Sequence, residues 1–324
     1  MTDADVVIDW LLDPGQSDPS IRWQVMRDLV DAPEPEWRAE RARVGTHGWG
    51  ARLLAAEDED GRWAGGAHFP ADYVWGGDEA GQPWTSTTHS LSQLREFGLE
   101  PAAMRRGVAL IGANCRWEHD GQPYWEGEVE PCINGMTVAN GTYFGVDMTP
   151  VVERLVGERL EDGGWNCEAE NGSVRSSFDT TINVLEGLLE YERSTGGTLE
   201  SRAARRAGEE YLLQRRLFRR LSTGEPIQKY LHLLHPNRWH YDVLRGLDYF
   251  RSASVVTGQP ADPRLAEAIE FIRSRRLDDG TWPLDWSPTG RVWFDVDGGE
   301  GKPSRWLTLR ALRVLKWWRA ATVP

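Results

Sequence analysis

Three stretches of the chain read LEDGGW (160–165), LDDGTW (277–282) and EDEDGRW (57–63), and a fourth, EHDGQPYW (118–125), is a degenerate copy. Each contains Asp-Gly, which is a turn signal because glycine takes the positive φ that ends a helix. The Trp that follows can fold back and pack between neighbouring helices. The recurrence predicts a chain built from helix pairs that are joined by one kind of turn.

Two sets of helical patterns alternate along the chain around these turns. The spacing of a helix is clearest at His240, Val243, Leu244, Leu247 and Phe250. The more apolar set begins at Pro19, Trp84, Pro131, Ser176, Arg238 and Ser304. The more polar set covers 6–12, 37–56, 102–113, 151–160, 201–218 and 263–276. No run keeps the two-residue alternation of a strand, so the sequence predicts an all-α fold.

Six apolar and six polar helices are enough to close a ring. We therefore predict an α6/α6 toroid, with six inner and six outer helices in one domain that spans residues 1–324. The segments 222–237 and 287–303 contain Gly, Pro and polar residues, and they are predicted to be loops over the rim, where function tends to reside. The 17 Trp indicate a recurring structural role, because a buried indole N–H needs a partner.

The bulk properties exclude several classes of partner. The net charge is −13 and the pI is about 5.1, so an acidic surface would repel nucleic acid. The longest apolar runs are far below the roughly 20 residues of a membrane span. Residues 1–13 carry acids and no basic stretch, so no signal peptide is expected. The chain has an odd number of cysteines, namely Cys115, Cys132 and Cys167, and no export signal is expected. We therefore expect reduced thiols and a cytoplasmic location. Peripheral membrane contact and the oligomeric state are left open.

The alternation of helices with DGxW turns resembles the QW-type repeats of squalene–hopene cyclases and the repeats of protein prenyltransferase β subunits. The chain is similar to short, single-domain bacterial prenyltransferase and squalene-oxidase repeat proteins of the terpenoid cyclase superfamily. This resemblance implies a cavity at the N-terminal ends of the inner helices and an apolar, isoprenoid-like small substrate. The sequence lacks the DxDD acid of the cyclases, and its nearest approach is Asp295-Val-Asp297.

A zinc site is the sharpest functional hypothesis. Cys132, Cys167 and His240 each lie near the start of an inner helix, and a toroid brings those starts to one face. Two thiolates and an imidazole suit tetrahedral Zn²⁺ with a fourth position open. Glu130-Pro-Cys132 and His240 are also similar to the zinc ligands of protein prenyltransferases, with Glu in place of Asp. The alternative is that the cysteines are small buried hydrophobes and that His240 forms an ordinary hydrogen bond.

Further candidates lie near the same helix starts. Glu130 and Asp242 are predicted as acid/base or supporting groups, although acids at helix N-termini are also favoured by the helix dipole. Arg305 is predicted to contact an anionic substrate group, because residues 301–305 resemble a diphosphate-binding stretch of prenyltransferases. The aromatic residues predicted to line the cavity, or else to belong to the core, are Trp84, Tyr143, Tyr241 and Trp286.

Three functions are therefore open. The first is a cyclase- or transferase-like toroid enzyme with a mononuclear zinc site, in which the metal activates a nucleophile or polarises an apolar substrate. The second is a metal-free class II terpene cyclase in which Asp295 or Asp297 is the acid. The third is a non-catalytic toroid that binds a lipid or a partner. The second and third require no metal.

Overall fold

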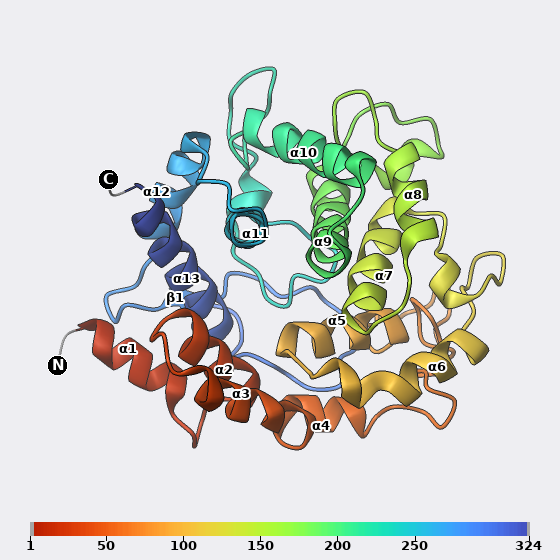
Figure 1. Ribbon diagram of the computed structural model, residues 1–324, viewed down its shortest axis with the longest axis horizontal. Helices are drawn as coiled ribbons and strands as arrows, with labels where there is room; N and C mark the ends of the chain where they lie inside the picture. The colour runs from red at the N-terminus through yellow and green to blue at the C-terminus, as the bar shows by residue number, and fades with distance from the viewer. Residues whose placement is uncertain (1–2, 323–324) are drawn as a thin grey trace.

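The computed structural model describes residues 3–322, and their helices form two concentric rings (Figure 1). The inner helices are α2 (Pro19–Asp28), α5 (Thr87–Phe97), α7 (Pro131–Tyr143), α9 (Phe178–Thr195), α11 (Val243–Thr257) and α13 (Arg305–Thr322). The outer positions are filled by α1 (Asp3–Leu12), α3 (Glu34–Ala42) together with α4 (Gly48–Leu54), α6 (Arg105–Asn114), α8 (Thr149–Gly157), α10 (Leu199–Gln214) and α12 (Ala266–Ser274). The predicted α6/α6 toroid is confirmed.

The inner ring closes by contact between neighbours in the order α2, α5, α7, α9, α11 and α13, and α13 returns to α2. The most extensive of these contacts joins α7 and α9, because two glycines let the backbones approach. A Cβ on Gly135 would lie 2.5 Å from the carbonyl of Asn183, and a Cβ on Gly187 would lie 2.5 Å from the Gly135 oxygen. This pair of helices therefore cannot hold larger side chains at those positions without moving apart.

The sequence predicted no strand, whereas the structure contains one short antiparallel pair. Strand β1 (Trp282–Pro283) pairs with β2 (Pro303–Ser304), with Trp282 opposite Ser304. The pair ties the third DGxW turn to the start of α13. Two residues per strand are too few to produce a readable alternation. Within residues 3–322, no helix combines the length and apolarity needed to cross a membrane.

The three DGxW turns have the same hydrogen-bonded geometry. Each Trp donates its indole N–H to the carbonyl ten residues earlier, in the last turn of the preceding outer helix. These bonds run from Trp63 to Leu53, from Trp165 to Leu155 and from Trp282 to Ile272, at 2.7–2.8 Å. Helix C-termini leave such carbonyls without a partner inside the helix. The Trp residues therefore cap the outer helices while they fill the space between the rings, where all three are fully buried.

A threonine at the start of the next inner helix completes each turn. The backbone N–H of the Trp donates to the Thr hydroxyl in all three copies. The pairs are Trp63 with Thr87, Trp165 with Thr181 and Trp282 with Thr308, at 3.0–3.2 Å. Each turn is thus bonded to the outer helix before it and to the inner helix after it. This double attachment fixes where the inner helices begin.

The glycine of each turn packs against the following outer position. Gly61, Gly163 and Gly280 all have positive φ, at 88°, 101° and 84°. An added Cβ would meet Leu110 of α6 from Gly61 and Ala207 of α10 from Gly163. From Gly280 it would lie 2.8 Å from Val7 of α1. The third turn therefore helps to close the ring between the two ends of the chain.

Substituting Gly163 by Ala tests this packing. The new Cβ would need a positive φ and would lie 2.7 Å from the Ala207 oxygen, so we expect a loss of about 2–4 kcal/mol. Gly172 is the matched control, because its φ is 88° and nothing lies within 4 Å of an added Cβ. Gly172→Ala should cost only about 1 kcal/mol. Urea unfolding measures both, and equal losses would contradict the packing role of the turn.

Candidate functional site

The centre of the ring encloses a cavity of about 700 Å³. All six inner helices, which surround the centre of the ring in Figure 1, contribute residues to its lining, together with the loop before α11. Its lining reaches Asp28 at the end of α2, Gly98 just beyond α5 and Tyr143 at the end of α7. The cavity therefore extends to the C-terminal ends of inner helices, whereas the sequence analysis placed it at their N-terminal ends.

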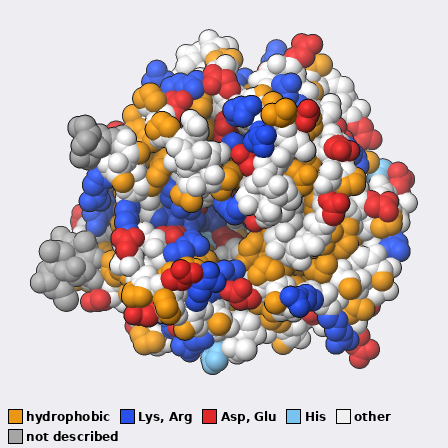
Figure 2. All heavy atoms as spheres, in the orientation of Figure 1, with side chains coloured by type: hydrophobic (Ala, Val, Ile, Leu, Met, Phe, Trp, Pro, Cys, Tyr) orange, Lys and Arg blue, Asp and Glu red, His pale blue; other side chains and the backbone are white. Residues whose placement is uncertain are grey.

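Charged side chains dominate this lining. Nine arginines and five acids face the cavity in a protein whose net charge is −13. The arginines are Arg27, Arg41, Arg95, Arg193, Arg238, Arg245, Arg251, Arg310 and Arg313. The acids are Asp28, Glu96, Glu186, Glu190 and Asp248. Figure 2 shows basic side chains within the hollow. An isoprenoid chain placed here would desolvate charges without giving them partners, which is unfavourable.

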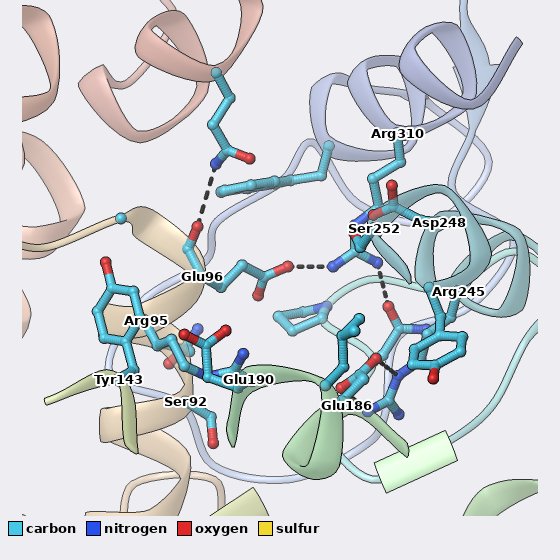
Figure 3. Close-up of a pocket in the computed structure, with 18 of the residues that line it drawn as sticks. Ser92, Arg95, Glu96, Tyr143, Glu186, Glu190, Arg245, Asp248, Ser252 and Arg310 are labelled. Carbon is cyan, nitrogen blue, oxygen red and sulfur yellow. Dashed lines mark hydrogen bonds and ion pairs between the residues drawn. The ribbon is translucent and has the colours of Figure 1, made fainter. Parts of the chain in front are cut away.

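One strong ion pair joins α9 to α11 across the cavity wall. The guanidinium of Arg245 donates Nε to Glu186 Oε1 and Nη2 to Glu186 Oε2, both at 2.8 Å, and also bonds Asn183 Oδ1 at 2.9 Å (Figure 3). Burial alone would raise the pKa of Glu186, but the attraction of Arg245 outweighs it and lowers that pKa. The carboxylate is therefore ionised and held in place by two parallel bonds.

Similar pairs join α13 to its neighbours. Arg310 pairs with Glu96 of α5, as Figure 3 shows, and Arg313 pairs with Asp248 of α11. Arg251 also donates to Asp248, at 2.8 Å. Burial would raise the pKa of Asp248, but the two arginines hold it well below its ordinary value. Because their arginine partners lower the pKa of Glu186 and of Asp248, neither carboxylate is poised to donate a proton at neutral pH.

Arg238 differs from these paired arginines. It precedes α11 at a φ of 54°, and its guanidinium lies over the ring of Trp84, 5.4 Å from the centroid. Within the described part of the chain, no carboxylate, carbonyl or hydroxyl accepts a hydrogen bond from this guanidinium. Burial lowers the pKa of Arg238 to about 10, so the side chain still carries its charge at pH 7. The charge of Glu96 acts on this partly buried cation, but no carboxylate among the described residues lies within ion-pair distance of it.

Arg95 is the second cavity arginine that forms no ion pair with a described residue. Its Nε donates to Asn140 Oδ1 at 3.1 Å, and no described residue accepts from its two Nη groups. It projects from α5 near Glu190 and Tyr143 (Figure 3). Sequence reasoning missed both Arg95 and Arg238 as site residues. A usable signal was present, since arginines and glutamates interrupt helices that are otherwise the apolar, inner ones.

A glutamine connects two buried histidines at the N-terminal side of the cavity. The Gln82 side-chain amide lies 3.0 Å from His68 Nε2 and 3.2 Å from His89 Nε2, while its oxygen accepts from Trp239 Nε1 at 3.1 Å. An NH₂ group has two protons, so it can satisfy both ring nitrogens only if both histidines are neutral. Burial lowers the pKa of His68 to about 4 and lowers that of His89 as well.

The structure brings together three of the predicted residues near the starts of α7 and α9. The Sγ atoms of Cys132 and Cys167 are 2.6 Å apart, and Cys132 Sγ lies 3.5 Å from Glu130 Oε2. A hydrogen bond with Cys167, together with burial, raises the pKa of the Cys132 thiol. Among the residues described, these three form the one group with metal-ligand spacing. None of them lines the central cavity.

His240 does not join the cysteines as predicted. Its ring centroid lies 3.6 Å from that of Trp239 and 5.0 Å from that of Trp286. The carbonyl of Trp239 accepts a bond from Asn183, which fixes this segment to α9. The imidazole is therefore held within an aromatic cluster, and the ligand set of the zinc hypothesis contains Glu130 in its place.

The other predicted polar residues have structural contacts and lie outside the cavity lining. Asp242 is fully buried as the N-cap of α11, where it accepts from the backbone N–H of Arg245 at 2.7 Å. Asp297 accepts from the Ser304 hydroxyl at the start of α13, and Asp295 is exposed. Arg305 stacks on Trp10 of α1, 4.4 Å from the ring centroid. None of these contacts supports the acid or anion-binding roles predicted from the sequence.

Of the four predicted cavity aromatics, Tyr143 lines the cavity. Its hydroxyl donates to the Leu99 carbonyl at 2.8 Å and accepts from Arg41 at 3.0 Å. Trp84 and Tyr241 are buried in contacts with loop carbonyls. Trp286 lies beside His240. For these three the structure matches the alternative of a packing role.

Comparison with known proteins identifies the fold alone. No family model matches the chain, and no curated protein matches it. Among solved structures, glycosyl hydrolase family 88 from Bacteroides vulgatus has a TM-score of 0.50 at 10% identity, over 98% of this chain and 99% of that one. A polysaccharide lyase has a TM-score of 0.48 at 12% identity, over 98% and 97% of the two chains. A protein from Actinoplanes has a TM-score of 0.46 at 16% identity, over 99% and 100%.

These similarities correct the family predicted from the sequence. The chain shares its toroid with a glycosyl hydrolase, and the predicted membership of the terpenoid cyclase and prenyltransferase superfamily is wrong. The physical reason lies in the DGxW turn, which caps an outer helix and positions an inner one. That task belongs to any toroid and does not identify a chemistry.

The buried histidines predict a loss of stability in acid. A histidine whose pKa is about 4 when folded and about 6.5 when unfolded contributes stability above pH 6.5, and this is lost as the pH falls towards 4. For His68 the loss is on the order of 3 kcal/mol. Urea unfolding from pH 7 to pH 4 should show a shallower decline for His68→Gln than for the wild type. His119→Gln is the control, because that side chain is exposed. Identical slopes for all three proteins would exclude His68 as the source.

Proposed function

We propose that the central cavity binds a small, polar, negatively charged molecule. The observation that carries this proposal is Arg238, a partly buried cation that lines the cavity and forms no ion pair or side-chain hydrogen bond with any described residue. An unpaired buried charge destabilises a protein, so its presence in a cavity wall points to a ligand that supplies the missing anion. Arg95, with two free Nη groups, offers a second contact.

The cavity supports this class of ligand in size and in rigidity. A volume of about 700 Å³ lies within the range of small-molecule sites and is too narrow for a folded partner. The pairs Arg245–Glu186, Arg310–Glu96 and Arg313–Asp248 cross-link four inner helices, so the wall is organised before a ligand arrives. Guanidinium groups bind carboxylates and phosphates through two parallel bonds, which suits either anion.

An acidic saccharide is the first ligand to test. One solved structure with this fold is a glycosyl hydrolase, so the toroid can accommodate a sugar-active site. A sugar acid adds a carboxylate for the arginines to a ring that can lie against an aromatic side chain of the lining, which includes Trp23, Tyr143 and Tyr249. Because the cavity carboxylates discussed above are paired with arginines, the geometry supports binding rather than proton transfer.

Replacing Arg238 by Met should change ligand binding and stability in opposite directions. Loss of a charge-assisted contact weakens binding by about 1.5–3 kcal/mol, which is roughly a ten- to hundredfold rise in Kd. Removal of an unpaired buried charge should also raise the free energy of unfolding of the ligand-free protein, by about 1 kcal/mol or more. Calorimetric titration with glucuronate and glucose, and urea unfolding without ligand, measure the two effects.

Two controls separate this result from general damage. Arg273→Met removes an exposed, surface-paired arginine and should change neither quantity. Arg245→Met should destabilise by about 3–5 kcal/mol, because it leaves Glu186 buried without its partner. The proposal fails if glucuronate, galacturonate and inorganic phosphate all leave the wild type unbound. It also fails if glucuronate binds wild type and Arg238→Met equally well.

A further inference from the structure

We propose that Glu130, Cys132 and Cys167 bind one zinc ion at the N-terminal starts of α7 and α9, separate from the anion cavity. Cys132 is the second residue of α7 and Glu130 is its N-cap. Cys167 comes from the short helix η4 (Cys167–Ala169), in the loop that follows the second DGxW turn. Residues 35 positions apart in sequence thus present two sulfurs and a carboxylate oxygen within 4.8 Å of one another.

The donor set selects the metal. Thiolates favour soft or borderline ions, and a carboxylate in the same set favours zinc over copper(I). Three protein ligands leave a fourth tetrahedral position for water or a substrate atom. Two thiolates and one carboxylate carry three negative charges, and a dication would offset two of them in this partly buried place.

The distances need one small adjustment to accept the ion. Zn–S bonds of about 2.3 Å place two sulfurs about 3.8 Å apart in a tetrahedral site, compared with 2.6 Å here. The sulfur and oxygen of Cys132 and Glu130, at 3.5 Å, are already near the separation of about 3.6 Å that zinc requires. Rotation of a cysteine side chain is therefore enough, because Cys132 and Cys167 are each partly exposed.

Neighbouring groups hold the three ligands in position. The backbone N–H of Glu130 donates to Glu128 Oε2 at 2.7 Å, and Asn134 bonds both the N–H and the carbonyl of Glu128. Thr180 of α9 lies 3.4 Å from Cys167 Sγ through its hydroxyl, which also accepts from the Cys167 N–H. The N-terminal ends of α7 and α9 favour negative charge at this point. Such supporting contacts are characteristic of sites that hold metal ligands in place.

Elemental analysis of the full chain, purified in reductant without chelator, tests the site. We expect about one zinc per chain in the wild type and a loss of nearly all of it in Cys132→Ser and Cys167→Ser. Glu130→Gln should retain less zinc after competition with a chelator. Cys115→Ala and His240→Ala are the controls and should retain the wild-type amount, because Cys115 is buried elsewhere and His240 lies outside the ligand group. Arg238→Met should also retain it, which separates this proposal from the anion cavity.

Cobalt substitution gives a second readout that does not depend on activity. Co²⁺ added to the zinc-free wild type should produce a thiolate-to-cobalt charge-transfer band, and this band should be absent from Cys132→Ser and unchanged in Cys115→Ala. The proposal is overturned if the wild type binds neither metal. It is also overturned if a thiol count without reductant finds one free thiol in place of three, which would mean a Cys132–Cys167 disulfide. Loss of zinc in His240→Ala with full retention in Glu130→Gln would overturn the ligand set.

Discussion

The hydrogen bond from each repeat Trp to the carbonyl ten residues earlier is the contact on which the toroid depends. It satisfies an outer-helix carbonyl that would otherwise be buried without a partner, and it places a large ring between the two layers. The Trp backbone then bonds the Thr of the next inner helix. One residue thereby fixes the end of one helix and the start of another. Three such turns follow α4, α8 and α12, so alternate helix pairs carry the same joint.

Local features such as these turns can be predicted from sequence, and distant pairings cannot. The signals that predicted the toroid are local: the Asp-Gly turn, the Trp that follows it and the helical spacing each involve residues close together in the sequence. These signals were therefore enough to predict a ring of helix pairs. The pair Arg310–Glu96 joins residues 214 positions apart, and nothing in either helix alone identifies its partner. The charged lining of the cavity therefore became visible only once the ring had closed.

The candidate metal ligands also show that contacts between residues far apart in the sequence are only partly predictable. A toroid brings the starts of its inner helices to one face, and that topological argument correctly placed Cys132 beside Cys167. It does not determine the rotation of each segment about its own axis. His240 is turned towards Trp239 and Trp286 by bonds that the loop makes to α9 and to Gln82. Glu130 precedes Cys132 by two residues and reaches the sulfurs as the N-cap of the same helix.

Most charged side chains of the cavity lining form ion pairs that stabilise the ring, whereas Arg238 does not. Most of its arginines are neutralised by acids on neighbouring helices, which turns a potentially repulsive lining into cross-links. If the lining served stability alone, Arg238 would also have a partner or would be replaced by an apolar residue of similar size. Its guanidinium lies over Trp84 but forms no ion pair with a described residue, and its backbone has a positive φ of 54°. A strained backbone and a charge without an ion pair, in a wall where Arg95 also has unused donors, are features expected of a ligand-binding site.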